Sequence, residues 1–239
     1  MNFEPENLYH IYNQGNNRQQ LFFSRDNYLF FLNKIKKHIL PHADILAWCL
    51  MPNHFHVMIY VYDVSPTHQM TESHQMSNDA PYQSTHQITE SHQMSNDAPY
   101  QSTHQMTESH QMSKIQSQAL IQSIAVMLRS YTRAINLQEN STGSLFKAHT
   151  KAECITKLQG ITPSFFGSQI NVRIPEKEYP QVCFNYIHQN PVNAKLVKRP
   201  EDWEFSSYRD YYGFRNGKLI NRARAAEFEL VKQENSSDD

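Results

Sequence analysis

Short apolar runs in this chain alternate with longer segments in which apolar residues recur every three or four positions. The short runs are rich in β-branched and aromatic side chains, which is typical of strands. Pro52 and Asn53 separate two of these runs and form a turn signal, so a β-hairpin is predicted there. Four segments are predicted as strands: 8–14, 43–51, 54–62 and 144–155.

The longer segments predict amphipathic helices. Ser24 can cap the first helix and Pro41 ends it, because a proline cannot continue a helix. Pro180 can open the last helix, and Pro191 is expected to end it. The first two predicted helices cover residues 25–40 and 114–136.

A tandem repeat separates the predicted hairpin from the second helix. Its 18-residue unit, at 68–85, returns at 86–103 with one change, and the first ten residues return at 104–113. The unit is rich in Ser, Thr, Gln, His and Asn, and it cannot bury enough apolar surface to offset the chain entropy lost on folding. We therefore expect a disordered insertion that acts as a spacer, which is a simpler interpretation than a histidine-rich metal-binding tract.

The predicted domain organisation follows from the position of this insertion. A chain of 239 residues fits one domain with insertions, or at most two small domains. We expect a single domain formed by 1–67 and 114–225, interrupted by the insertion 68–113 and followed by a C-terminal tail, 226–239.

Composition narrows the class of protein. No apolar run approaches the roughly 18–20 residues that a membrane span needs, and the N-terminus lacks the basic and apolar regions of a signal peptide. Cys49, Cys154 and Cys183 form no CxxC pair, so neither a disulfide framework nor a cysteine-based zinc site is indicated. We therefore expect a cytoplasmic protein with no membrane partner.

The charge of the chain is unevenly distributed. The net charge is −1, but the segment 68–113 holds five acidic residues and no Lys or Arg. The rest of the chain has 22 basic and 18 acidic residues. That mildly basic balance is compatible with DNA binding without proving it.

His54 and His56 form a candidate metal site. Residues two apart on a strand project from the same face of a sheet, so both imidazoles can bind one ion. Two nitrogens and one oxygen would leave open positions on a divalent ion, as Lewis-acid catalysis requires. By itself, the pair is weak evidence, because such a spacing also arises by coincidence in a core or on a surface.

Tyr186 and Asn190 are the second candidate pair. They are four residues apart on a predicted helix and therefore neighbours on one face of it. A tyrosine hydroxyl can act as a nucleophile. The simpler alternative is that Tyr186 belongs to the core face of a short helix and that Asn190 merely precedes its end.

Three segments together resemble the single-tyrosine HUH transposases, and among them the REP-associated tyrosine transposases. They are YHIYNQGNNR (9–18), HFH (54–56) after a strand and a turn, and YIHQNP (186–191) followed by LVKRPEDWEFSSY. The segments occur in the order expected for that family, and the resemblance covers about 1–62 and 114–213. The repeat and the long segment 156–179 depart from the family pattern without removing a catalytic residue.

The resemblance implies an α+β fold in which helices flank an antiparallel sheet of ferredoxin-like or RNA-recognition-like type. It implies that His54, His56 and Asn190 bind Mg²⁺ or Mn²⁺ and that Tyr186 is the nucleophile. The implied activity is that of a transposase-like single-strand DNA endonuclease and strand transferase with a covalent 5′-phosphotyrosine intermediate. The implied partner is single-stranded or hairpin DNA.

The sequence leaves several points open. A catalytically silent regulator that binds hairpin DNA on the same fold is the main alternative, and a structural metal-binding module is a more distant one. The DNA target and the oligomeric state, for which a homodimer is one arrangement, are not determined. Five basic residues are candidate phosphate contacts: Arg18, Lys34, Lys37, Arg129 and Arg133.

Overall fold

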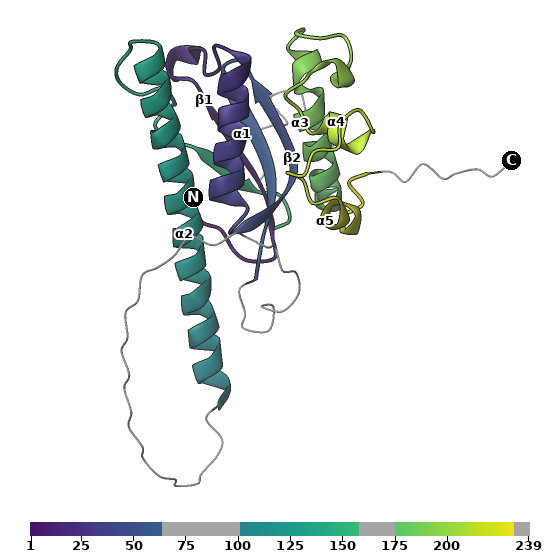
Figure 1. Cartoon of the computed structure of the whole chain (residues 1–239). Helices are drawn as coiled ribbons and strands as arrows, with labels where there is room; N and C mark the ends of the chain where they lie inside the picture. Colours follow the sequence, from purple (N-terminus) through teal and green to yellow (C-terminus); the bar gives the residue numbers. More distant parts are fainter. Residues whose placement is uncertain (64–100, 158–174, 232–239) are drawn as a thin grey trace, which may run out of the picture.

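The computed structural model describes residues 1–63, 101–157 and 175–231. At its centre lies a four-stranded antiparallel sheet with the strand order β2-β3-β1-β4 (Figure 1). Because β3 and β1 occupy the two central positions, each of them is paired along both edges. The strands are β1 (Leu8–Gln14), β2 (Ala43–Met51), β3 (His54–Val61) and β4 (Lys151–Cys154).

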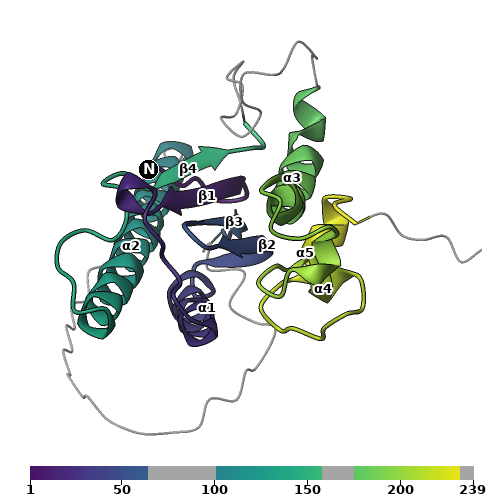
Figure 2. The same ribbon diagram turned by 90° about the horizontal axis from the view of Figure 1, so that it is seen from above.

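Helices cover both faces of this sheet. The view from above shows α1 and α2 on one face and α3, α4 and α5 on the other (Figure 2). The helices are α1 (Arg25–Ile39), α2 (Gln101–Gln138), α3 (Tyr179–Asn193), α4 (Tyr208–Tyr211) and α5 (Arg222–Glu227). Within the described residues, three single 3-10 turns accompany them: η1 (Asn16–Arg18), η4 (Glu176–Glu178) and η5 (Pro200–Asp202). The predicted α+β class, an antiparallel sheet flanked by helices, is confirmed.

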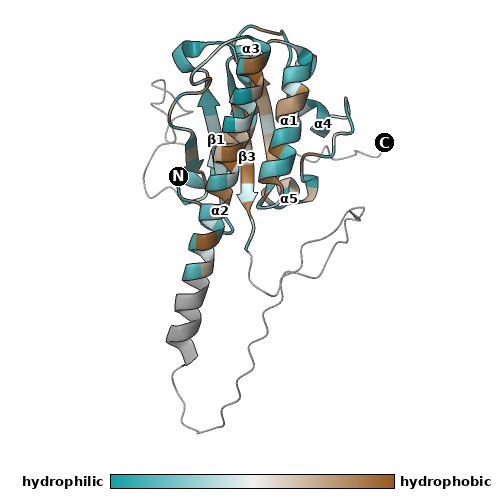
Figure 3. Cartoon of the chain, turned by 60° about the vertical axis from the view of Figure 1, so that its left-hand side comes forward, coloured by the Kyte–Doolittle hydropathy of each residue, from teal (hydrophilic) through white to brown (hydrophobic). Residues whose placement is uncertain are grey.

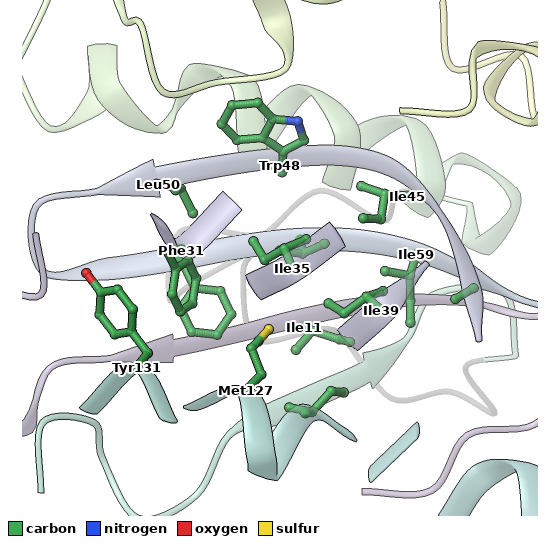
Figure 4. Packing of buried hydrophobic residues seen from close by; sticks show 14 of the residues in the cluster. Ile11, Phe31, Ile35, Ile39, Ile45, Trp48, Leu50, Ile59, Met127 and Tyr131 are labelled. Carbon is green, nitrogen blue, oxygen red and sulfur yellow. The ribbon is translucent and has the colours of Figure 1, made fainter. Parts of the chain in front are cut away.

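The main core lies between the sheet and the pair α1 and α2. Alternate residues of the strands point into it, and aromatic and aliphatic residues of both helices meet them (Figure 4). Full burial of each such side chain stabilises the folded state by about 1.5–3 kcal/mol. Residues at the centre of this cluster include Ile11, Phe31, Ile35, Phe55, Val57, Ile59, Met127 and Tyr131. The intervening residues of β1 and β3 therefore face α3.

The fourth predicted strand is shorter than expected. Only Lys151–Cys154 pairs with β1, although 144–155 was predicted, and Phe146 forms an isolated bridge with Gly15. The Asn13 side-chain amide donates to the Lys147 carbonyl at 3.2 Å and to the Thr150 hydroxyl at 2.8 Å. Together with the backbone bond from the Lys147 N–H to the Gln14 carbonyl at 2.8 Å, these side-chain bonds hold the segment before β4 beside β1.

The prediction that Pro191 ends the helix that carries Tyr186 is wrong, because this helix, α3, continues to Asn193. A proline lacks only its own N–H, so it removes one bond, to the carbonyl of Ile187, rather than the whole last turn. The turn is closed by the Ala194 N–H, which donates to the Asn190 carbonyl at 2.9 Å.

The boundaries of the insertion and of the tail also differ from the prediction. Helix α2 begins at Gln101, so residues 101–113 are helical, although they were predicted as disordered repeat. Extending an existing helix avoids the cost of nucleation, which a composition-based argument does not consider. Figure 3 shows α2 running past the end of the sheet. In the predicted tail, α5 reaches Glu227 and Leu230 is buried.

Several predicted features lie outside the described residues: the insertion between 64 and 100, most of the loop-rich segment 156–179, and the tail from 232 onward. Within the part of the chain that the structure describes, no helix is both long enough and apolar enough to cross a membrane.

The packed part of α2 begins close to the end of β3. Met112 and Ile115 are exposed, whereas Gln116 and Ser117 are buried. The Gln116 side-chain amide donates to the carbonyl of Tyr62, just after β3. The start of the packed helix and the end of the hairpin are therefore already adjacent.

Deleting 68–113 and joining Thr67 to Lys114 is expected to leave a folded protein, because Gln116 already contacts Tyr62 and only a short connection is needed between the hairpin and the packed part of α2. The free energy of closing a loop changes only slowly with its length, so the melting temperature should stay within a few degrees of the wild type. Circular dichroism melting tests this expectation. A large drop in melting temperature would show that the repeat contributes to the fold.

Candidate active site

Strand β3 presents both candidate histidines on the sheet face that is covered by α3. Phe55 and Val57 point into the opposite core, so the two-residue period of the strand turns His54 and His56 toward α3. His56 is buried, with 4% of its surface exposed, whereas His54 is half-buried at the end of the strand. The burial of the intervening residues fixes where the two imidazoles lie.

His54 lies between Asn53 and Asn190. Its Nδ1 is 2.7 Å from the Asn53 side-chain oxygen, and its Nε2 is 3.4 Å from the Asn190 side-chain oxygen. An oxygen at 2.7 Å can only accept, so Nδ1 carries the ring proton and Nε2 carries a lone pair. Two lone pairs therefore meet at 3.4 Å, which suits two ligands of one cation.

His56 offers a third candidate ligand atom. Its Nδ1 is 2.9 Å from Nε2 of His10, and its own Nε2 is buried with no hydrogen-bond partner among the described residues. A buried polar atom without a partner costs about 1–3 kcal/mol. A divalent cation would give this nitrogen a partner, so the residues present fit the expected Mg²⁺ or Mn²⁺.

Burial keeps the imidazoles neutral. Desolvation lowers the pKa of His10 to about 3 and also lowers the pKa of His54. The pKa of His56 is well below its usual value because of burial, followed by repulsion from His10 and His54. Since metals bind the neutral ring, all of these groups are available as ligands or hydrogen-bond partners at neutral pH.

Tyr186 of α3 lies beside the histidines. Its ring meets the His56 ring edge-on, with 5.4 Å between the centroids. Burial raises the pKa of Tyr186, a hydrogen bond with Asn190 lowers it, and the Glu153 carboxylate adds to the rise. The net pKa is raised, so the phenol is neutral in the protein alone, and a nearby cation would favour its ionised form.

A buried hydrogen-bond network fixes α3 against β2. His188 Nε2 lies 2.8 Å from the Ser207 hydroxyl. That hydroxyl accepts a bond from the backbone N–H of Trp48 at 2.8 Å and donates to the backbone carbonyl of Trp48 at 3.2 Å. These bonds tie the helix that carries Tyr186 and Asn190 to the hairpin that carries the histidines.

The site opens into a pocket of about 280 Å³. A groove of about 570 Å³ adjoins it, and both are lined by Asn13, Lys147 and His149. No Asp or Glu occurs among the described residues that line either one. Lys151 and Tyr186 line the pocket, and Arg129 and Arg133 of α2 line the groove.

The five candidate phosphate contacts are not all near this pocket. Arg129 and Arg133 line the adjoining groove. The backbone carbonyl of Arg18 accepts a hydrogen bond from the side-chain amide of Asn53, the residue before His54. Lys34 and Lys37 lie on α1, which covers the other face of the sheet.

Lys34 extends over the Phe30 ring, with 5.0 Å between Nζ and the ring centroid. Lys37 lines a separate cavity of about 1180 Å³ with Lys36 and Arg222. The structure therefore brings neither lysine to the candidate active site.

Sequence reasoning missed several residues of the site. His10 and Glu153 occupy opposite positions on β1 and β4, and Glu153 accepts a hydrogen bond from the Tyr12 hydroxyl at 2.8 Å. Lys147 and His149 approach the pocket because Asn13 holds their segment against β1. Leu8, His10 and Tyr12 alternate along β1 and therefore share one face of the strand. Placing His10 on the same sheet face as His54 and His56 would also have required knowing that β1 pairs with β3.

A metal site here depends on an amide ligand. Among the described residues, no group of three or more His, Cys, Asp or Glu side chains is placed to hold a metal ion. His54 and His56 supply two nitrogens, and the oxygen measured next to His54 Nε2 belongs to Asn190. The ligand set of two imidazoles and one amide stays a prediction, as does metal binding itself.

Neither a protein-family model nor a curated protein matches this chain. Among solved structures, it is similar to a REP-associated tyrosine transposase bound to a REP hairpin, with 16% sequence identity and a TM-score of 0.43. The match covers 92% of this chain and 91% of the other.

Proposed function

We propose that this protein is a metal-dependent single-strand DNA endonuclease and strand transferase of the single-tyrosine HUH class, with a ferredoxin-like sheet. The observations that carry the proposal concern two imidazoles and one amide beside a tyrosine. His54 Nε2 lies 3.4 Å from the Asn190 side-chain oxygen. His56 Nε2 is buried with no hydrogen-bond partner among the described residues, and the His56 ring meets the Tyr186 ring edge-on. The family resemblance of the sequence supplies the expected substrate, hairpin DNA with a flanking single strand.

In the proposed reaction, the Tyr186 oxygen attacks phosphorus. The O–P bond forms as the P–O3′ bond breaks, the phenol proton passes to water, and the departing 3′ oxygen takes up a proton. The product is a 5′-phosphotyrosine, which conserves the energy of the phosphodiester, so a 3′-hydroxyl can reverse the step elsewhere.

The metal would be held by His54, His56 and Asn190. When bound, it would supply Lewis-acid stabilisation of charge on the phosphate oxygens. The buried pocket wall around His56 restricts water, and in such surroundings charge–charge interactions are stronger than in bulk solvent.

The groove supports a nucleic-acid partner. Four basic residues line the groove and the adjoining pocket. Arg129 and Arg133 line the groove, Lys147 lines both spaces, and Lys151 lines the pocket together with Tyr186. A pocket of about 280 Å³ is at the small end of the roughly 300–1,000 Å³ of ordinary ligand sites. It suits an unpaired nucleotide rather than a duplex.

Replacing Tyr186 with Phe is expected to abolish a covalent DNA adduct while hairpin affinity and melting temperature stay nearly unchanged. The substitution removes only the attacking oxygen from a ring that keeps its packing. Purified protein with Mg²⁺ and labelled hairpin DNA, analysed on denaturing gels with and without protease, measures the adduct. Tyr212→Phe, at a tyrosine that is 47% exposed, is the matched control and should form the adduct normally.

Two results would count against this assignment. An adduct that persists in the Tyr186→Phe variant would mean that another residue is the nucleophile. Hairpin binding by the wild type with no adduct under any metal condition would instead favour the catalytically silent regulator.

His54→Ala and His56→Ala are each expected to reduce cleavage by at least 100-fold, and Asn190→Ala is expected to cause a smaller loss. The two imidazoles would supply most of the protein's bonds to the ion, whereas water can partly replace an amide oxygen. Cleavage should be followed across a Mn²⁺ titration. A His54→Ala variant with the same Mn²⁺ dependence as the wild type would contradict the proposed metal site.

The double substitution Arg129→Gln and Arg133→Gln is expected to weaken binding of single-stranded DNA. Each lost phosphate contact should reduce the slope of log affinity against log salt by about 0.7. Fluorescence anisotropy without metal, on the Tyr186→Phe background, isolates binding from chemistry. The matched control is Lys36→Gln with Lys37→Gln on α1, which removes equal charge; an equal effect of both pairs would argue against the groove.

A further inference from the structure

His10 and His56 are bonded to each other at the base of the proposed metal site. His10 comes from β1 and His56 from β3, and their rings are inclined by only 20° with 5.1 Å between the centroids. The bond joins His10 Nε2 and His56 Nδ1 at 2.9 Å, and both side chains are buried, with 1% and 4% of their surface exposed.

Only one proton can lie in this bond, and its position decides whether His56 can bind a metal. If His10 donates, the remaining proton of the neutral His56 ring must be on Nε2, where it blocks metal binding. If His56 donates from Nδ1, its Nε2 keeps a lone pair, and His10 carries its own proton on Nδ1. The two rings therefore change tautomer together.

We propose that His10 is a positioning residue that accepts the Nδ1–H of His56 and thereby directs the His56 Nε2 lone pair at the cation. This inference rests on the proposed metal site and deepens it. His10 is not itself a ligand in this arrangement, because its Nε2 is occupied by the bond to His56.

The placement of His10 favours this role over simple core filling. Its neighbours on the same face of β1 include Leu8, which packs in an apolar cluster, so an aliphatic residue would suit the position if only packing mattered. Instead, the His10 imidazole lies within hydrogen-bond distance of His56, whose Nε2 has no hydrogen-bond partner among the described residues. Partners of this kind orient metal-binding histidines and raise their basicity.

The first test measures Mn²⁺ affinity by isothermal titration calorimetry in the absence of DNA. His10→Phe keeps a ring but removes the acceptor and should weaken Mn²⁺ binding about 10–100-fold, the usual effect of losing such a partner. His10→Gln offers an amide oxygen as acceptor and should restore part of the affinity. Tyr131→Phe, which removes a buried hydrogen bond to the Leu21 carbonyl on the other sheet face, is the control and should bind Mn²⁺ normally.

The second test reads the tautomer directly. Long-range proton–nitrogen NMR correlation of ¹⁵N-histidine protein with Mg²⁺ should show His56 protonated on Nδ1 in the wild type. In His10→Phe, the same ring should lose this preference. Protonation of His56 on Nε2 with Mg²⁺ present, or unchanged Mn²⁺ affinity in a folded His10→Phe variant, would overturn the inference.

Neither measurement involves DNA or Tyr186. If the nuclease activity proved absent, a metal site that depends on His10 would still be detected. If no Mn²⁺ bound to the wild type at all, the proposed metal site would fail together with this role of His10.

Discussion

The buried central strand β3 is the constraint on which the rest of the site depends. Phe55 and Val57 are locked in the core against α1 and α2, so a slip of one residue would bury both histidines on the wrong face. That cost fixes the register of β3 with both neighbours. The positions of His54 and His56, and the meeting of His56 with His10, follow from this register.

The second half of the site depends on how α3 is attached to the sheet. His188, Ser207 and Trp48 form a buried network whose loss would leave polar atoms without partners. The strength of this attachment allows a helix with an internal proline to present Tyr186 and Asn190 accurately. Rigid elements, rather than loops, therefore carry the candidate nucleophile and ligands, which is typical of sites that need precise geometry.

Local patterns allowed much of the fold to be predicted, because β1, β2 and the two candidate pairs depend on spacing within one element. The turn between β2 and β3 is also visible in the sequence, because Pro52 and Asn53 directly precede His54. The partnership of His10 with His56 could not be predicted, since it depends on which strands are neighbours. The start of α2 at Gln101 was not predicted, because a polar composition says nothing about whether a neighbouring packed helix can extend into the segment without a new nucleation cost.

The electrostatics of the site connect its two halves. Burial keeps His56 neutral and raises the pKa of Tyr186, so the protein alone holds neutral rings around uncompensated lone pairs. A divalent cation would act on both halves of the site. It would bind the imidazole nitrogens, and its charge would lower the pKa of Tyr186 by stabilising the ionised phenol. The cationic groove with Arg129 and Arg133 would then bring a phosphate whose charge balances the ion. The metal and the DNA are thus expected to bind in a mutually dependent way, so the half-buried Tyr186 would stay neutral until both are present.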